Sequence, residues 1–459
     1  MMNSQTAPGL DVLLQNARRR AGLTQEQLAG LSTVSVRAIR DLELGRVQHP
    51  RKETLRLLAN AMRLTDARRI ELELAVDAQA VGRVFQDIYG ADLAVPPTPL
   101  RPLVGRRPEL EALTARLSTE HERLLTLVGL PGVGKTRLAQ EAASVLHSRD
   151  RVPVLWVAAD GGAESGGAAA NSPLSTMTGW VRALVRDGEK LDELATVIGR
   201  KPTLIVLDGY DSSPSAIRPL LNLLRVCERV KILTTTCRPV QLPGGRLLPL
   251  APLPVPAPSD LAGSLPGDSL VTDRPAVELM LSHVSHMRPD FLPTDTVTTT
   301  AAHICRALDA IPQALEAAAS WLLLYSPEQL LDIARTVPLV LVDGVTPTDP
   351  AAGPTLSDRL AAAVTGLGPC ATALLRTPVD PWTVDDAARA NGTSLAETAR
   401  DAHALLVRGL IRQLPTTPGG PVGFTVLNLV RAALVAEQER EQEREQERER
   451  GSLVDALVE

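Results

Sequence analysis

The sequence predicts a multidomain chain in which an all-α segment is followed by a doubly wound parallel α/β segment and then by further helices. Three observations support this order. Apolar residues recur at helical spacing through the first 64 residues, apolar strands alternate with helices from about residue 103 to 250, and helices followed by a hairpin occupy residues 274–436. The chain has 459 residues, a length that fits about three domains.

Composition and charge limit the classes of function that the chain can have. Hydrophobic residues make up 44% of the chain and aromatic residues only 2%, so we expect cores built from Leu, Val and Ala. The net charge of −5 argues against nucleic-acid binding by the chain as a whole. Residues 1–64, however, carry ten Lys/Arg against five Asp/Glu, which makes this segment a basic module within an acidic chain.

Targeting and redox signals are absent from the sequence. The four cysteines, Cys227, Cys237, Cys305 and Cys370, lie far apart without metal-ligand spacing, so we expect reduced thiols. The N-terminus lacks the charged and apolar regions of a signal peptide, and no apolar run is long enough to span a bilayer. We therefore expect a cytoplasmic protein that makes no membrane contact.

The most informative motif is a phosphate-binding loop at residues 129–136, which read G-L-P-G-V-G-K-T. An apolar strand precedes it and a helical pattern follows it. Glycines at Gly129, Gly132 and Gly134 let the backbone N–H groups surround an anion at the helix N-terminus. Lys135 is expected to reach the β- and γ-phosphates, and Thr136 to offer its hydroxyl to Mg²⁺. The loop predicts binding of a purine nucleotide, ATP or ADP.

Strand candidates around this loop predict a parallel sheet with the nucleotide at its carboxyl edge. They are Leu124–Val128, Val152–Val157, Thr203–Leu207 and Val230–Thr234. The Gly- and Ala-rich run Asp160–Pro173 reads as a surface insertion, and the Pro-rich run Pro249–Pro266 as the end of the domain.

Two residues that follow strands are candidates for the nucleotide site. Asp208 closes the run T-L-I-V-L-D and is expected on the strand next to the phosphate-binding loop, where it would hold the Mg²⁺ shell, with Asp211 as a helper. A simple helix cap is the alternative. Arg238 ends K-I-L-T-T-T-C-R and could contact the γ-phosphate, the alternative being a surface arginine before a proline turn.

The first 78 residues predict short-looped helices. Thr24 is expected to cap one helix with Gln27 as its capping-box partner, and Gly45 to end another. A further helical stretch covers Asp66–Ala78, and four prolines between Val95 and Pro102 indicate a linker.

Helices followed by a hairpin, Gly409–Leu414 and Val422–Leu427, predict a winged-helix unit near the C-terminus. The repeated E-Q-E-R run after it leaves two alternatives open, a solvated arm and an oligomerisation helix.

From Leu103 to Ala436 the chain resembles the NB-ARC type of signal-transduction ATPases with numerous domains, the STAND class. The run L-V-G-R-R-P-E-L matches the family segment that packs on adenine, and C-R-A-L-D-A-I-P-Q-A-L matches the family's Gly-Leu-Pro-Leu motif. The resemblance implies nucleotide contacts beyond the lysine and threonine of the loop, by Val104, Gly105, Arg106, Arg137, Arg238 and Pro312.

Three positions depart from the family pattern. Ala310 and Gln313 replace the outer residues of the Gly-Leu-Pro-Leu motif, Gly209 stands where many relatives have a second acid, and no Met-His-Asp sensor is visible. Because a carboxylate that orients water supplies much of the hydrolysis rate, we expect nucleotide binding with slow hydrolysis. Lys135 and Asp208 are the catalytic candidates.

Residues 9–64 resemble the helix-turn-helix of the Cro/XRE repressor family. Ala29, Val34, Ile39 and Leu42 are expected to lock two helices across a turn, although Thr33 stands where the turn usually has Gly. The resemblance places the helix Ser35–Leu44 in the major groove of double-stranded DNA. The expected base contacts come from Val36, Arg37, Arg40 and Asp41, and the expected phosphate contacts from Gln25, Arg46 and Arg51, with Ser35 as a further expected DNA-binding residue.

The resulting domain expectation is a helix-turn-helix DNA-binding domain (1–78), a linker (79–102), a P-loop NTPase domain (103–272), a helical domain (273–350), a winged-helix-like domain (351–436) and a charged tail (437–459). The leading functional hypothesis is an ADP/ATP-switched transcriptional regulator that forms homo-oligomers in response to an unknown signal or partner protein. An ATPase whose turnover drives assembly and a protein-interaction scaffold are the alternatives.

Overall fold

The computed structural model describes residues 10–47, 50–64, 95–99, 101–158, 173–210, 214–238, 243–255, 274–344, 353–377, 380–414 and 420–458. The predicted helical stretch Asp66–Ala78, nearly all of the insertion Asp160–Pro173 and most of the Pro249–Pro266 run therefore lie outside the described residues.

The N-terminal module is a four-helix unit with its own core. Its helices are α1 (Leu10–Arg20), α2 (Gln25–Ser32), α3 (Val36–Glu43) and α4 (Lys52–Ala61). Ile39 and Leu42 are buried against these helices, with Ala29 and Val34 packed beside them, as the sequence predicts. Thr24 caps α2 in a capping box with Gln27, and Thr33 adopts φ 58°, so this threonine occupies the left-handed region that favours glycine.

The second domain is a five-stranded, fully parallel sheet with the order β2-β3-β4-β1-β5. Its strands are β1 (Leu124–Val128), β2 (Val154–Ala158), β3 (Thr203–Asp208), β4 (Val230–Thr236) and β5 (Arg246–Pro249). β2 begins at Val154, two residues after the start at Val152 that the sequence predicts, and β5 is not among the predicted strands. The reason for this omission is that β5 is only four residues long at the sheet edge, too short to show an apolar pattern.

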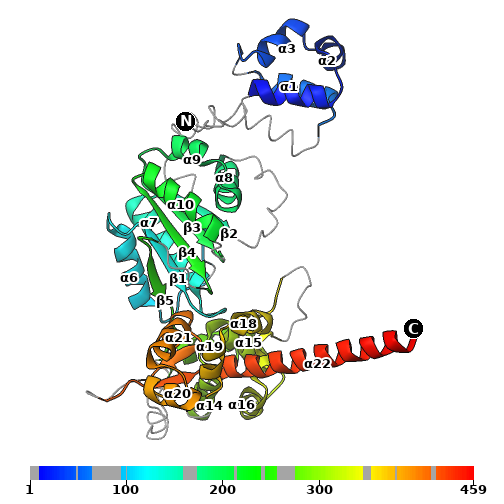
Figure 1. Ribbon diagram of the computed structural model, residues 1–459. Helices are drawn as coiled ribbons and strands as arrows, with labels where there is room; N and C mark the ends of the chain where they lie inside the picture. Colours follow the sequence, from blue (N-terminus) through cyan, green and yellow to red (C-terminus); the bar gives the residue numbers. More distant parts are fainter. Residues whose placement is uncertain are drawn as a thin grey trace.

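Helices cover both faces of this sheet (Figure 1). α6 (Arg107–Ser118) and α7 (Lys135–Asp150) pack on one face through Leu113, Leu138 and their neighbours. α8 (Pro173–Asp187), α9 (Leu191–Ile198) and α10 (Pro214–Val226) pack on the other face around Trp180. The doubly wound arrangement expected from strand–helix alternation is confirmed.

The rest of the described chain is a helical region with one continuous core that runs from Ala276 to Leu434. Its helices are α13 (Pro275–Met287), α14 (Asp295–Ala307), α15 (Pro312–Trp321), α16 (Pro327–Thr336), α17 (Pro338–Val342), α18 (Leu356–Val364), α19 (Pro369–Leu375), α20 (Val384–Asn391), α21 (Leu395–Arg408) and α22 (Asn428–Val458). The shared core crosses the boundary that the sequence analysis drew at residue 350.

A two-stranded antiparallel hairpin, β6 (Ile411–Gln413) and β7 (Phe424–Val426), precedes α22, as the sequence predicts. α22 then runs without interruption from Asn428 to Val458, so the predicted start of the tail at residue 437 lies inside a helix. Figure 1 shows α22 extending away from the helical region, and the side chains of Glu441–Arg444 are exposed.

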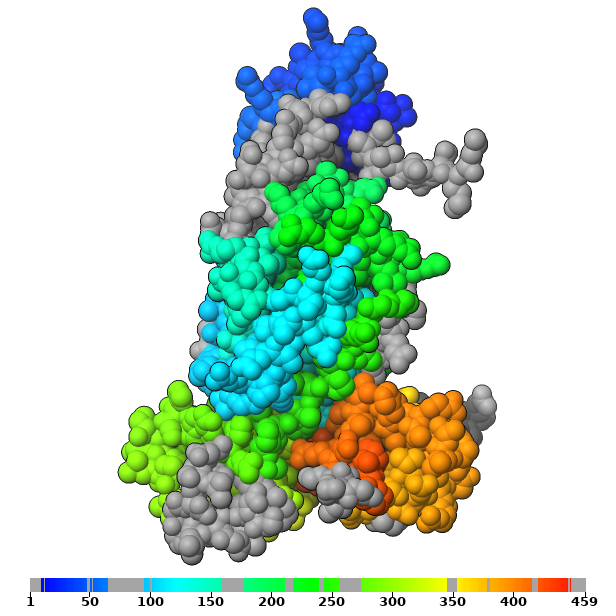
Figure 2. Space-filling view, turned by 90° about the vertical axis from the view of Figure 1, so that its left-hand side faces the viewer, coloured from blue at the N-terminus to red at the C-terminus, as the bar shows by residue number. Residues whose placement is uncertain are grey.

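The sheet domain rests directly on the helical region, as the space-filling view in Figure 2 shows. Two backbone hydrogen bonds join them, from Gln313 N–H to the Gly132 carbonyl (3.2 Å) and from Leu253 N–H to the Ala310 carbonyl (3.1 Å). The first of these bonds lies in the phosphate-binding loop, so the helical region contacts the loop that the sequence singled out.

Candidate nucleotide site and DNA-reading surface

The backbone of the phosphate-binding loop needs its glycines for different reasons. A Cβ on Gly129 would lie 2.6 Å from the Leu250 carbonyl oxygen, which is closer than real Cβ contacts. Gly132 (φ +76°) and Gly134 (φ +100°) adopt conformations that strain other residues. A Cβ on Gly132 would also meet side chains from the helical region at 3.1 Å. The loop therefore wraps tightly and ends where α7 begins.

Lys135 lies under this loop, almost fully buried. Its ammonium donates hydrogen bonds to the carbonyls of Gly129 (3.0 Å) and Leu130 (2.8 Å) and approaches the Cys237 sulfur at 3.3 Å. Burial lowers the pKa of Lys135, while the neighbouring Cys237 opposes this effect. A buried ammonium group whose hydrogen-bond partners are neutral oxygens is suited to binding an anion.

Asp208 and Thr136 come together as expected for a Mg²⁺ shell, but not by the expected route. The Thr136 hydroxyl donates to the Asp208 carboxylate at 2.7 Å, and the Thr235 hydroxyl donates to the same oxygen at 2.7 Å. The expectation that Asp208 sits on the strand beside β1 is wrong, because β4 lies between β1 and β3. The carboxylate reaches Thr136 across the end of β4, while Asp211 lies outside the described residues.

Arg238 follows β4 at the same carboxyl edge and is exposed. Its guanidinium donates to the Ala362 carbonyl in α18 at 3.4 Å, so it bridges the sheet domain and the helical region. Gly209 adopts φ +70° and its N–H donates to the Thr235 hydroxyl at 2.8 Å. The residue after Asp208 is therefore a turn glycine that offers no carboxylate at this edge of the site.

The segment expected to pack on adenine lies at the other end of the site. Gly105 adopts φ +65°, and a Cβ there would overlap Pro275 at 2.1 Å. Arg106 is buried and donates to the carbonyls of Val133 (3.1 Å) and Ala251 (2.7 Å) as well as to Glu109. Arg106 thus braces this segment against the phosphate-binding loop.

Pro312 is the first residue of α15, and the residues before it determine how α15 meets the phosphate-binding loop. Asp309 and Ala310 both adopt positive φ (56° and 55°), which turns the chain sharply before the proline. This turn brings Gln313 against Gly132.

These elements enclose a cavity of about 1250 Å³, large enough for a nucleotide. Nearly all of the predicted nucleotide residues line it: Val104, Arg106, Gly132, Gly134, Lys135, Thr136, Arg137, Arg238 and Pro312. The groups present fit a nucleoside polyphosphate with Mg²⁺, since the loop, Lys135 and the Thr136–Asp208 pair are the expected phosphate and metal contacts.

The cavity wall also contains residues that the sequence analysis did not assign to the site, notably His283, Glu316 and Arg359. They come from α13, α15 and α18, more than 140 residues after the phosphate-binding loop. Arg359 stands in the ordinary amphipathic run S-D-R-L-A-A-A-V, which contains no motif, so no sequence signal marks it.

In the N-terminal module the predicted base-contacting residues lie on one helix. Arg37 and Arg40 are exposed on α3, and Val36 is half-buried. Ser35 caps this helix by accepting the Ala38 N–H at 3.2 Å. Asp41 pairs with Arg46 at 3.4 Å, which offsets the negative charge that the sequence placed near DNA.

The residues predicted to contact DNA phosphates flank this helix but differ in how free their side chains are. The Gln25 side-chain amide donates to Glu43 at 2.8 Å, so it is engaged inside the module. Arg46 is exposed beyond α3, and Arg51 is exposed at the start of α4. A basic exposed helix with flanking arginines is the arrangement that DNA-reading modules use.

Comparisons with known proteins agree with this division. Residues 12–72 match a family model described as a helix-turn-helix domain, and residues 102–190 match one described as an AAA ATPase domain. The chain carries a DNA-binding helix-turn-helix domain and a P-loop ATPase domain. The parallel sheet of the second domain and the four helices of the first are consistent with these matches.

Two relatives from Mycobacterium tuberculosis (strain ATCC 25618 / H37Rv) are similar over part of their length. The "Uncharacterized protein Rv0894" is 31% identical over 245 residues, covering 50% of this chain and 53% of the relative. The "Putative HTH-type transcriptional regulator Rv0890c" is 32% identical over 212 residues, covering 46% of this chain and 21% of the relative. The chain thus spans about half the length of one relative and about a fifth of the other.

Among solved structures, the chain is similar to the crystal structure of Cdc6p from Pyrobaculum aerophilum at 12% sequence identity and a TM-score of 0.28, covering 76% of this chain and 98% of that one. In the part of the chain that the structure describes, no helix is both long and apolar enough to cross a membrane.

Proposed function

We propose that this protein is a nucleotide-switched transcriptional regulator of the NB-ARC, or STAND, type. ATP or ADP with Mg²⁺ would occupy the cavity, and DNA would be bound by an XRE-type helix-turn-helix. The observation that carries the proposal is that the cavity wall is shared, since the phosphate-binding loop comes from the sheet domain while Gln313 and Arg359 come from the helical region. A nucleotide there contacts both parts at once.

A shared wall supports switching because a ligand shifts an equilibrium only by its different affinity for two states. ADP and ATP differ by the γ-phosphate, and we propose that this group is contacted by Arg238, which lines the cavity and donates to the Ala362 carbonyl across the boundary. We infer that ADP favours a closed arrangement of the sheet domain on a winged-helix-like unit formed by α18–α22 with the hairpin. ATP, together with a signal, favours an open arrangement.

The DNA side of the proposal rests on α3. Arg37 and Arg40 would contact base edges in the major groove, and Arg46 and Arg51 the phosphates. Self-association in the open state would pair two modules for half-sites about one DNA turn apart. The homo-oligomer, the signal and the partner protein are parts of this proposal.

The alternative, an ATPase whose turnover drives assembly, differs from the switch in its rate of ATP hydrolysis. Asp208 would help to hold Mg²⁺, but Gly209 offers no carboxylate to orient water, so we propose slow hydrolysis. Steady-state turnover above about 1 s⁻¹ with saturating ATP would favour the enzyme over the switch. A scaffold that uses the N-terminal module to bind protein would show no salt-dependent affinity for duplex DNA.

The decisive test of the site is Lys135→Ala in the full chain. We expect ATP and ADP affinity, measured by calorimetry, to fall by more than about one hundredfold, because a buried ammonium to phosphate contact is lost. Lys190→Ala is the matched control, since Lys190 is a surface lysine paired with Glu193 outside the cavity. Unchanged nucleotide affinity of the Lys135 variant would overturn the site assignment.

The switch itself is tested by mapping bound DNA across a genome with wild-type and Lys135→Ala protein. A regulator controlled by nucleotide loses or gains occupied sites in the variant. Identical maps for both proteins would separate DNA binding from the nucleotide and contradict the switch.

A further inference from the structure

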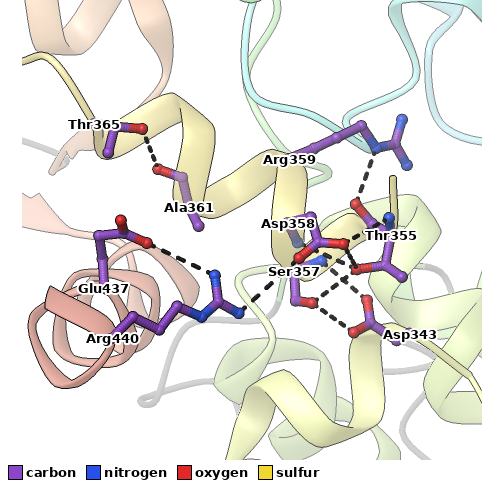
Figure 3. Close-up of polar contacts among 9 residues, drawn as sticks. All are labelled: Asp343, Thr355, Ser357, Asp358, Arg359, Ala361, Thr365, Glu437 and Arg440. Atoms are coloured by element: carbon purple, nitrogen blue, oxygen red, sulfur yellow. Dashed lines mark hydrogen bonds and ion pairs between the residues drawn. The ribbon is translucent and has the colours of Figure 1, made fainter. Parts of the chain in front are cut away.

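The cavity contains an arginine, Arg359, that no motif predicts. It projects from α18, a helix held firmly at its start (Figure 3). Thr355 caps α18 in a capping box with Asp358. The Ser357 N–H and hydroxyl donate to the two Asp343 carboxylate oxygens at 2.9 and 2.5 Å. These contacts tie the N-terminal turn of α18 to the end of α17.

The remaining surfaces of α18 fix its rotation. Leu356, Leu360 and Val364 are buried in the core of the helical region. On another side, Arg440 of α22 approaches Asp358 at 4.0 Å and Glu437 at 3.6 Å (Figure 3). With these faces occupied, the Arg359 side chain lines the nucleotide cavity.

Arg359 has only neutral hydrogen-bond partners among the described residues. One guanidinium nitrogen donates to the Gln313 amide oxygen at 2.9 Å, and Nε donates to the Thr355 carbonyl at 3.3 Å. One helical turn further on, the Ala362 carbonyl accepts the Arg238 guanidinium. Two arginines from different domains therefore reach the same part of the cavity.

The charge balance of the cavity wall favours a polyanion. Among the described residues, six cations line it, Arg101, Arg106, Lys135, Arg137, Arg238 and Arg359, against one lining carboxylate, Glu316, while the Asp208 carboxylate lies behind the wall, bonded to Thr136. Glu109 and Glu141 pair with two of these arginines from outside the wall. Lys135, Arg238 and Arg359, at the phosphate end, have neutral hydrogen-bond partners.

These cations are also close enough to influence one another. Burial is the main cause that lowers the pKa of Lys135, Cys237 opposes it, and the positive charge of Arg359 lowers this pKa further while the Asp208 carboxylate raises it. Like charges gathered in one cavity are unfavourable unless an anion lies between them. Planar guanidinium groups are matched to phosphate oxygens, which they can bind through two hydrogen bonds.

We propose that Arg359 is a phosphate-binding residue supplied to the nucleotide by the helical region, and that Gln313 is the positioning residue that holds its guanidinium at the phosphate-binding loop. The proposal rests on the proposed nucleotide binding and extends it to the C-terminal part of the chain. Arg238 and Arg359 would bind the terminal phosphates from the two sides of the domain boundary.

This proposal explains the departure at Gln313 from the family motif, which has an apolar residue there. The Gln313 backbone N–H donates to Gly132 while its side-chain oxygen accepts from Arg359. A leucine could make the backbone contact but not the side-chain one. Gln313 thus links the phosphate-binding loop to α18.

The test compares ATP, ADP and AMP binding by the full chain with and without Arg359→Gln. We expect ATP affinity, measured by calorimetry, to fall about ten- to one hundredfold, the effect of losing hydrogen bonds between charged groups. AMP affinity should change less than about threefold, because AMP lacks the terminal phosphates. Arg359→Lys should recover part of the ATP affinity, since it restores the charge without the planar fork.

Gln313→Leu tests the positioning role. It should weaken ATP binding less than Arg359→Gln, and the double variant should bind ATP as weakly as Arg359→Gln alone, because Gln313 acts through the arginine. Arg389→Gln is the matched control, since Arg389 is an exposed arginine of the helical region that pairs with Asp386. Thermal melting of each variant checks that the fold is retained.

The outcomes separate this proposal from nucleotide binding itself. If Lys135→Ala loses ATP and ADP while Arg359→Gln binds ATP like the wild type, the nucleotide site stands and the role of Arg359 is wrong. If Arg359→Gln weakens ATP and AMP equally, the arginine supports the cavity instead of contacting terminal phosphates. If Lys135→Ala also binds normally, the proposed function fails first.

Discussion

Arg18 in the N-terminal module and Arg359 in the nucleotide cavity are both largely shielded arginines, but their partners differ. Arg18 forms two hydrogen bonds with the Glu43 carboxylate, at 2.6 and 2.8 Å, and the side chains are 12% and 2% exposed. Among the described residues, Arg359 donates only to the neutral oxygens of Gln313 and Thr355. The positive charge of an arginine is therefore balanced by a carboxylate in the N-terminal module but faces only neutral oxygens of described residues in the nucleotide cavity.

The difference separates a structural charge from a functional one. A buried cation with a well-placed carboxylate has its charge satisfied within the fold. A cation that faces neutral oxygens gains most when an anion arrives. On α3, Arg37 and Arg40 are exposed and form no ion pair with another described residue, and the anion proposed for them is DNA.

The largest expected effect comes from breaking the Arg18–Glu43 pair. Glu43→Gln keeps the shape of the side chain but leaves Arg18 without its counter-charge, so we expect the N-terminal module to lose about 3 kcal/mol of stability. Hydrogen exchange of peptides from residues 10–64 in the full chain measures this loss.

Glu53→Gln provides the control for this variant, because the Glu53–Arg56 pair is 63% and 66% exposed. Its effect should stay below about 0.5 kcal/mol. If Glu43→Gln destabilises the module no more than Glu53→Gln does, the Arg18–Glu43 pair contributes no more stability than an exposed ion pair, which contradicts the comparison.

Asp309 extends the comparison of buried charges from arginines to a carboxylate. Its carboxylate accepts the N–H groups of Asn428 (3.0 Å) and Leu429 (2.8 Å) at the start of α22. Burial raises its pKa from the ordinary 3.8 to about 6, against the effect of these bonds. The protonated form is thus favoured in the fold, and the contribution to stability is present below pH 4 and lost as the pH rises through 6.

We expect Asp309→Asn to remove this pH dependence, which amounts to about 2–3 kcal/mol between pH 4 and 7. Urea unfolding at a series of pH values measures it as the difference between wild type and variant. A difference that stays constant with pH would show that Asp309 titrates normally in the fold. Glu43 has the opposite sign, since its hydrogen bonds to Arg18 and Gln25 outweigh burial and lower its pKa.

Arg37→Ala tests the exposed cations of α3. We expect the affinity for a specific DNA site to fall by about 1–3 kcal/mol, the range for an arginine that contacts a base. ATP affinity should be unchanged. Arg56→Ala is the control, since Arg56 is paired with Glu53 on α4. Equal losses for both variants, or for specific and random DNA alike, would mean that Arg37 supplies charge without reading sequence.

The smallest effect concerns backbone strain in the same module. Thr33 adopts φ 58° and ψ 12°, a conformation that costs non-glycine residues about 1 kcal/mol. Thr33→Gly should stabilise the module by about 0.5 kcal/mol, since glycine relieves this strain but loses more entropy on folding. Hydrogen exchange across α2 and α3 measures the change, and a loss of protection there would contradict it.

Sequence patterns were sufficient wherever the structure depends on neighbouring residues. The capping box of Thr24 and Gln27, the strand ahead of Gly129 and the helix after Gly134 follow from local preferences, and the structure confirms each. The phosphate-binding loop is itself a local motif, since its glycines and Lys135 lie within eight residues. The sequence assigns Thr136 and Asp208 to the same Mg²⁺ shell, because a strand-ending Asp downstream of such a loop is a recurring pattern, and the hydrogen bond between the two side chains brings them together.

Tertiary structure alone decided which distant residues complete the site. The order of the strands placed β4 between β1 and β3, and the turn at Asp309 and Ala310 brought Gln313 against Gly132. Arg359 reaches the cavity because burial of Leu360 and the anchoring of Ser357 fix the rotation of α18. Sequence patterns register propensity and periodicity over a few turns, whereas a cavity wall depends on how whole elements pack, and that packing leaves no local signal.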